Sequence, residues 1–181
     1  YPKNQIEKIL NQKFTRLKTI ASSIKDRKIL EISVTERVPQ YTWCGAVLPE
    51  PDANNGTCYF LDETGYIFDE APYFSGEVFF KFYGLTDLKD NIPSGFYFSE
   101  IIFPKLILFK ETLEHMELKP VALYIMDDGN IKVYLSNESL LNRGPEIILR
   151  ADSDFQKKAE NLEVALTTEP LQSNFKNKYS S

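Results

Sequence analysis

Residues 28–39 read Lys-Ile-Leu-Glu-Ile-Ser-Val-Thr-Glu-Arg-Val-Pro, and this stretch decides the predicted fold. Leu30, Ile32 and Val34 alternate with polar residues, which is the period-two pattern of a β-strand. Pro39 is a natural boundary because proline has no backbone N–H to donate to a neighbouring strand. The stretch therefore predicts a strand over 28–37 that ends at a change in the chain's organisation.

The residues before this strand predict a helix and a second strand. Ile6, Leu10 and Phe14 recur at helical spacing, so we expect a helix over 4–14. A strand is expected over 17–24, and Asp26-Arg27 would form a tight turn into the strand over 28–37. We therefore expect a small α/β unit over residues 1–38.

Downstream of Pro39 the pattern is dominated by strands. We expect them over 41–44, 58–62, 66–70, 77–83, 121–127, 130–136 and 146–150. Asp128-Gly129 favours a type I′ hairpin turn between two of them. One helix is expected from a Ser99 cap to Glu117, with a kink or a later start at Pro104. A second should run from Ser153 or Asp154 to Leu166. The fold class is thus α+β: a truncated α/β unit, then a larger domain over 39–181 with an antiparallel β-sheet and two helices.

Composition and charge narrow the functional classes. The chain has 181 residues, of which 43% are hydrophobic and 26% charged, with a net charge of −5. A mildly acidic overall balance gives no electrostatic footprint for DNA, RNA or anionic lipid. The best apolar run, 101–109, is broken by Pro104 and Lys105, whereas a membrane span needs roughly 20 residues. The sequence begins with neither a signal peptide nor an anchor, so it reads as a fragment of a longer protein.

The two cysteines, Cys44 and Cys58, leave two alternatives open. They are either two buried thiols or a disulfide, and a single histidine cannot complete a Cys2His2 zinc site. Both flank a loop over 45–57 that is rich in glycine, proline and asparagine. We predict that they lie close across an antiparallel strand pair and can form a disulfide.

Residues for catalysis, cofactor binding or metal binding do not stand out. His115 follows Glu114 near a helix C-terminus, where a structural role is expected. Nucleophile-elbow, phosphate-loop and dinucleotide-binding motifs do not occur in the sequence. The acidic pairs at 62–63, 69–70 and 127–128 fall at predicted strand ends and turns, where solvated carboxylates are the ordinary interpretation. We therefore expect a protein that is not an enzyme.

An ordered series of motifs resembles the FtsQ/DivIB family of bacterial cell-division proteins. The strand over 28–39 with its Glu-Arg-x-Pro ending resembles the strand that closes the family's POTRA domain. A short aromatic strand (41–43), an apolar strand (59–61), an acidic-x-x-Gly turn (62–65) and a strand (66–68) follow in the family's order. So do the long helix, the hairpin, the strand at 146–149 and the helix at 155–162. The resemblance implies a partial POTRA-like domain over 1–38 and an FtsQ-like β domain over 39–181.

Two departures from the family pattern concern the ends of the chain. The family's POTRA domain has a strand and a helix before the helix expected at 4–14. The family also ends with a further strand of I-D-L-R-like pattern, and this chain stops just short of it, at Ser181.

The resemblance also implies a function. Family members are single-pass inner-membrane proteins that face the extracytoplasmic side, lack catalytic activity and bind FtsB and FtsL to help regulate septal wall synthesis. Partners bind at the C-terminal end of the β domain, partly by strand addition. That implies partner-binding positions at Lys158, Glu163, Lys178 and Tyr179, and an anchor outside this chain. Two alternatives remain: a POTRA-type chaperone module, and an extracytoplasmic ligand-binding or enzymatic domain.

Overall fold

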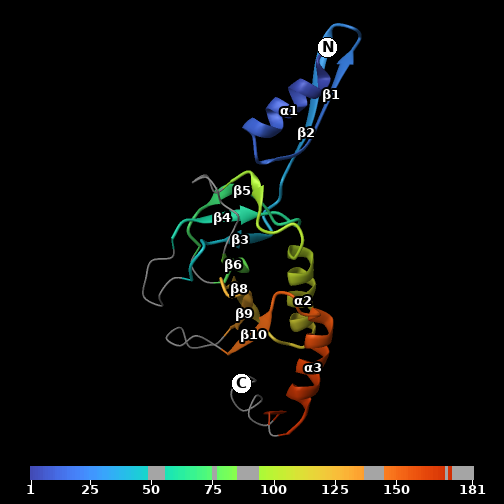
Figure 1. The fold of residues 1–181 in the computed structure, drawn as a ribbon. Helices are drawn as coiled ribbons and strands as arrows, with labels where there is room; N and C mark the ends of the chain where they lie inside the picture. The colour runs from blue at the N-terminus through green and yellow to red at the C-terminus, as the bar shows by residue number, and fades with distance from the viewer. Residues whose placement is uncertain (49–55, 75–76, 85–93, 137–144, 170, 173–181) are drawn as a thin grey trace.

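The structure, a computed structural model, describes residues 1–48, 56–74, 77–84, 94–136, 145–169 and 171–172. It consists of a small N-terminal unit and a larger part built on a single sheet (Figure 1). The mixture of helices and two separate sheets confirms the predicted α+β class.

The N-terminal unit is a β-hairpin with one helix on its face. Helix α1 (Lys3–Lys13) is followed by β1 (Leu17–Lys25) and β2 (Ile29–Glu36), which pair antiparallel. Asp26 and Arg27 both have positive φ, and Lys28 N–H donates to the Lys25 carbonyl at 3.1 Å, which closes the expected tight turn. Leu30, Ile32 and Val34 share one face of β2, as their alternation predicts, but they are 44%, 41% and 49% exposed.

The larger part is an eight-stranded sheet in the order β10-β9-β8-β6-β3-β4-β5-β7. Its strands are β3 (Tyr41–Trp43), β4 (Cys58–Leu61), β5 (Tyr66–Ala71), β6 (Lys81–Gly84), β7 (Phe96–Tyr97), β8 (Pro120–Ile125), β9 (Asn130–Leu135) and β10 (Glu146–Arg150). The sheet is mixed rather than wholly antiparallel, because β6 runs parallel to both β3 and β8. Helix α2 (Phe103–His115) lies in the connection from β6 to β8, as parallel neighbours require a crossover.

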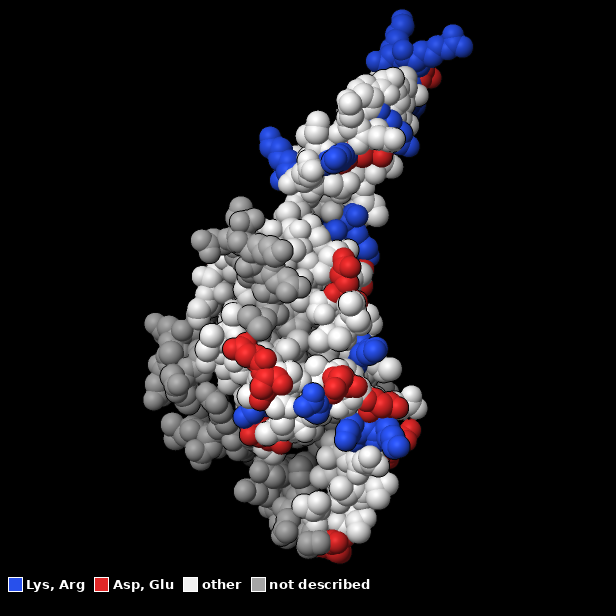
Figure 2. Space-filling view, in the orientation of Figure 1, with Lys and Arg blue, Asp and Glu red and all other residues white. Residues whose placement is uncertain are grey.

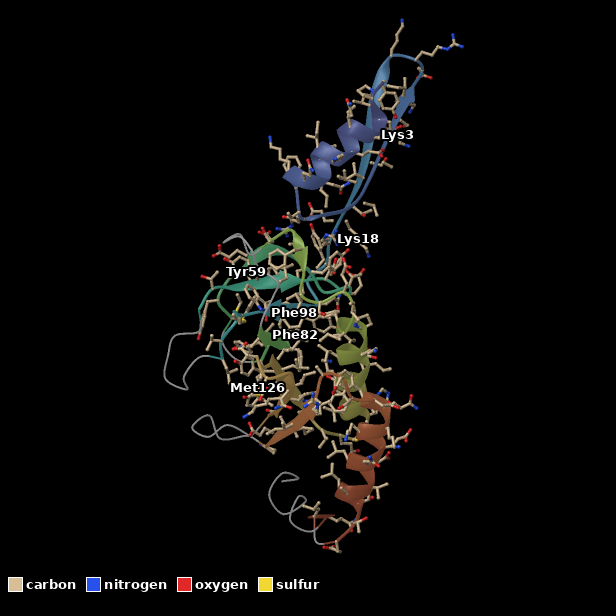
Figure 3. All side chains as sticks on the ribbon, viewed as in Figure 1. Lys3, Lys18, Tyr59, Phe82, Phe98 and Met126 are labelled. Atoms are coloured by element: carbon tan, nitrogen blue, oxygen red, sulfur yellow. A yellow bond between two sulfur atoms is a disulfide. The ribbon has the colours of Figure 1, made fainter. Side chains whose placement is uncertain are left out.

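The core lies between the sheet and two helices on the same side of it (Figure 1). Helix α2 contributes Leu106 and Leu113, and α3 (Phe155–Thr167) contributes Phe155 and Ala159, as its spacing predicted. Figure 3 labels Phe82 and Phe98, whose ring centroids are 5.2 Å apart in this core. Among the described residues no member of the core cluster precedes Trp43, and the domain boundary at Pro39 stays a prediction.

Three local expectations were wrong. The strand expected over 77–83 is confined to β6, because Phe79 packs against Phe74 and Phe60, with ring centroids 5.1 and 5.6 Å away, instead of extending the ladder. Ser99 does not cap α2 with its side chain, whereas the later start expected at Pro104 is confirmed, because the helix begins at Phe103 with Pro104 in its first turn. The hairpin between β8 and β9 is not type I′, since Gly129 alone in that turn has positive φ.

Candidate functional site

The junction between the N-terminal unit and the sheet is built around Arg37 and Asp62. Arg37 comes from the Glu-Arg-x-Pro stretch, and Asp62 from the acidic-x-x-Gly turn between β4 and β5. The Arg37 guanidinium forms an ion pair with Asp62, whose side chain is fully buried. It also lies 3.8 Å from the centroid of the Tyr66 ring, and its Nε donates to the Thr15 carbonyl at 3.1 Å. One arginine therefore contacts both parts of the molecule.

Asp62 is held by three further hydrogen bonds. Its Oδ1 accepts from the backbone N–H of Thr64 at 2.9 Å, from the Thr64 hydroxyl at 2.6 Å and from the backbone N–H of Tyr66 at 3.1 Å. Burial raises the pKa of Asp62, but the hydrogen bonds from Thr64, Arg37 and Tyr66 outweigh it, so the net pKa is lowered. The expectation that Asp62 is a solvated carboxylate was wrong, because its charge is compensated inside the junction.

Exposed contacts surround this buried pair. Arg16 bonds Asp69 at 2.7 Å, and Lys18 forms an ion pair with Glu63. Figure 3 shows Lys18 where the N-terminal unit meets the sheet. The Thr15 hydroxyl donates to the Phe68 carbonyl at 2.6 Å. The junction is therefore a network of ion pairs and hydrogen bonds, and its role is to position the two parts of the molecule.

The outer edge of β10 is the strongest candidate for a binding site. Among the described residues β10 pairs with β9 alone, at one end of the sheet. Leu135 N–H bonds the Pro145 carbonyl, and Ala151 N–H bonds the Gly129 carbonyl. Ladder bonds of an antiparallel pair alternate, so Glu146, Ile148 and Arg150 direct their backbone N–H and C=O groups outward. Such an edge is a template for another strand.

The structure describes two of the four residues expected to bind a partner. Lys158 and Glu163 lie exposed on α3, away from the buried Phe155 and Ala159. Lys178 and Tyr179 lie outside the described residues. The sequence did not predict that β10 lies at the edge of the sheet. It also did not predict that Arg37 contacts Asp62, although the Glu-Arg-x-Pro and acidic-x-x-Gly motifs that contain these residues were recognised.

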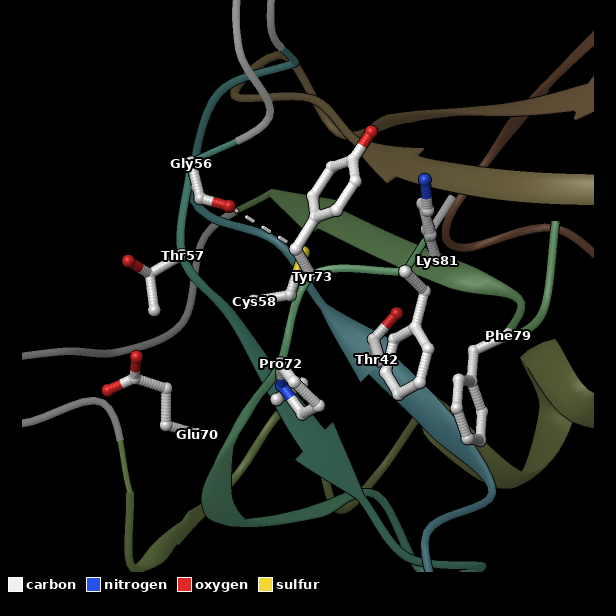
Figure 4. A pocket seen from close by; sticks show the side chains of 11 residues that line it. Thr42, Gly56, Thr57, Cys58, Glu70, Pro72, Tyr73, Phe79 and Lys81 are labelled. Carbon is white, nitrogen blue, oxygen red and sulfur yellow. Dashed lines mark hydrogen bonds between the residues drawn. The ribbon is translucent and has the colours of Figure 1, made fainter. Parts of the chain in front are cut away.

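A pocket of about 270 Å³ opens beside Cys58 (Figure 4). Cys44 and Cys58 are joined in a disulfide, with their Cα atoms 4.1 Å apart. Tyr73, Glu70 and Lys81 are among the residues that line the pocket. The described residues hold no group of three or more His, Cys, Asp or Glu side chains arranged for a metal ion.

His115 is exposed at the end of α2, with Nδ1 2.7 Å from the Glu111 carbonyl oxygen. No described helix has the length and apolar character needed to cross a bilayer. In comparisons with known proteins, no family model and no curated protein matches the chain.

Proposed function

We propose that the chain is the extracytoplasmic part of a non-catalytic cell-division scaffold of the FtsQ/DivIB type. It is held at the inner membrane by an anchor outside these residues and binds division proteins of the FtsB and FtsL type. The single observation that carries this proposal is the outer edge of β10, at the end of the eight-stranded sheet, which no strand covers among the described residues. An open strand edge suits a protein whose work is to receive another chain.

The geometry of the edge supports strand addition. A guest strand satisfies the outward N–H and C=O groups of Glu146, Ile148 and Arg150, while its alternate side chains set specificity. Ile148 is 56% exposed on one face of β10, and Leu149 is buried on the other. A guest strand therefore has an apolar contact at the centre of the edge as well as backbone partners.

The junction supports the family assignment independently of the β10 edge. The ordered series behind the resemblance includes two separate motifs, Glu-Arg-x-Pro and acidic-x-x-Gly, which are 25 residues apart at Arg37 and Asp62. In the folded chain their charged members are direct partners. A shared structural reason for both motifs makes their joint occurrence more informative than either alone.

The test is a titration of an FtsB-type peptide against two forms of the protein. One is the 181-residue chain, and the other is extended by the residues that follow Ser181 in its gene. The β10 edge is present in both forms, and the resemblance places a final strand after Ser181 that completes the site, so we expect weak binding by the shorter form and tighter binding by the longer one. Equally tight binding would show that the residues after Ser181 contribute nothing to the site, and failure of both forms would contradict the proposed function.

A proline variant locates the site within the longer form. Ile148→Pro removes an N–H that points away from β9, so the ladder to β9 is retained. Ile148→Ala is the matched control, because it shortens the same side chain but keeps the N–H. We expect Ile148→Pro to weaken binding about tenfold more than the control, from the loss of one edge hydrogen bond.

A further inference from the structure

The turn between β1 and β2 forms one extremity of the molecule and carries a concentration of positive charge. We use "hairpin tip" for residues 24–30. Lys25, Arg27 and Lys28 are all exposed there, and Asp26 is the one anion among them. Figure 2 shows the basic side chains at the far end of the N-terminal unit, whereas acidic side chains gather on the larger part. The tip is thus cationic in a chain whose net charge is −5.

The three cations of the hairpin tip stand outside the ion pairs that the structure describes. No ion pair involves Lys25, Arg27 or Lys28 within the part of the chain that the structure describes. The nearest acidic groups on the same hairpin are Asp26 and Glu31. Four of the other six basic residues of the N-terminal unit are paired: Lys3 with Glu7, and Arg16, Lys18 and Arg37 at the junction. The tip's charge is therefore available to an external anion.

Exposed aliphatic side chains flank the cations on both faces of the hairpin. Ile24 and Leu30 are cross-strand partners on the face that α1 covers in part, and they remain 42% and 44% exposed. Ile29 is paired with Lys25 on the opposite face and is 56% exposed. At about 3.4 Å per residue these side chains lie within roughly 7 Å of the turn. That distance matches the depth to which interfacial segments enter the headgroup region of a bilayer.

We propose that the hairpin tip binds the surface of an anionic phospholipid bilayer, with its cations among the phosphates and its aliphatic side chains between the headgroups. Cations beside apolar groups favour a lipid surface over nucleic acid, which offers little apolar surface to Ile24, Ile29 and Leu30. The N-terminus lies at the same end of the molecule (Figure 1), where the Tyr1 hydroxyl donates to the Ser22 carbonyl at 2.7 Å. The orientation rests on the proposed function, since a bilayer lies at this end if the anchor precedes Tyr1.

The experiment is sedimentation of the 181-residue chain with vesicles at millimolar lipid. We expect binding to vesicles containing phosphatidylglycerol, little binding to pure phosphatidylcholine, and a loss of binding as salt rises. The tip variant is Lys25→Gln/Arg27→Asn/Lys28→Gln, with asparagine at 27 because it tolerates the positive φ there. At about fivefold per cation, this variant should bind roughly a hundredfold more weakly.

The matched control is Lys105→Gln/Lys119→Gln/Lys157→Gln, which removes the same charge from the larger part and should bind like the unmodified chain. Ile29→Ser should weaken binding without changing its salt dependence. Equal loss in the tip and control variants, or no binding by the unmodified chain, would overturn the proposal. The proposal would also be overturned if the chain bound polyglutamate more tightly than phosphatidylglycerol vesicles and Ile29→Ser did not change that binding. This outcome would identify an acidic macromolecule as the partner. Peptide binding at β10 is measured without lipid, so failure here leaves the proposed function standing.

Discussion

At the scale of single residues, Asp62 carries the largest structural consequence. Its carboxylate is fully buried, and four donors from Thr64, Tyr66 and Arg37 compensate it. Gly65 completes the turn with φ of +79°, and a Cβ there would lie 2.6 Å from the Phe103 ring. The turn therefore requires a charged side chain at Asp62 and the absence of a side chain at Gly65.

The first prediction at this scale concerns Asp62→Asn. Asparagine keeps the acceptor for Thr64 and Tyr66 but removes the charge opposite Arg37, so we expect a loss of about 2–3 kcal/mol at neutral pH, measured by urea unfolding. Glu63→Gln is the matched control. Its carboxylate pairs with Lys18 on the surface, so it should cost less than about 1 kcal/mol.

The pH dependence of the same variant gives a second measurement. The pKa of Asp62 in the folded protein lies below its ordinary value of 3.8. Its contribution is therefore fully present above the unfolded pKa and is lost as pH falls through the folded pKa. The stability difference between the unmodified protein and Asp62→Asn should be constant near neutrality and narrow below pH 3.8. A difference that persists unchanged in acid would show that the charge is not what stabilises the turn.

At the scale of elements, the ends of β3 and β4 are joined covalently. Cys44 directly follows β3, Cys58 is the first residue of β4, and the two cysteines are 14 residues apart in the sequence. Closing a loop of this length reduces the conformational entropy of the unfolded chain.

We predict that Cys44→Ala/Cys58→Ala unfolds at a lower urea concentration, with a loss of about 3 kcal/mol. A reducing agent should lower the stability of the unmodified protein by a similar amount and leave the double variant unchanged. If the reductant has no effect on the unmodified protein, the two cysteines are free thiols in solution and not a disulfide.

At the scale of the whole molecule, the junction sets the direction in which the N-terminal unit extends from the sheet. Among the described residues, one buried ion pair and two exposed ones connect the parts, together with the hydrogen bond from Thr15 to Phe68. Exposed pairs weaken in salt, whereas a buried pair is screened much less. The orientation should therefore depend mainly on Arg37.

Small-angle X-ray scattering tests this dependence. The unmodified protein should give the same distance distribution at low and high salt, because the Arg37–Asp62 pair persists. Arg37→Ala should broaden the distribution by freeing the N-terminal unit, while Lys18→Ala, which removes an exposed pair, should not. A broad distribution for the unmodified protein would mean that the junction does not fix the orientation.

The sequence by itself determined the features that depend on local periodicity. The alternation of Leu30, Ile32 and Val34, the apolar stripe of α3 and a cap at Ser153 or Asp154 all depend on neighbours within a few residues. The structure selects Asp154, whose side chain accepts from Lys157 N–H at 3.2 Å. These features were enough to predict the α+β class and most of the elements. The exceptions were the short β7, which has too few residues for a pattern, the start of β6, where ring packing replaced the ladder, and the start of α2, which Ser99 does not cap.

The tertiary structure alone decided which of these features face solvent and which meet each other. The burial of Asp62 depends on Arg37, a residue 25 positions away, and an acidic pair beside a turn ordinarily predicts exposure. The mixed sheet and the open edge of β10 follow from strand order, which periodicity does not encode. Likewise, a basic turn becomes an extremity of the molecule only because a single helix and a two-stranded sheet carry it away from the core.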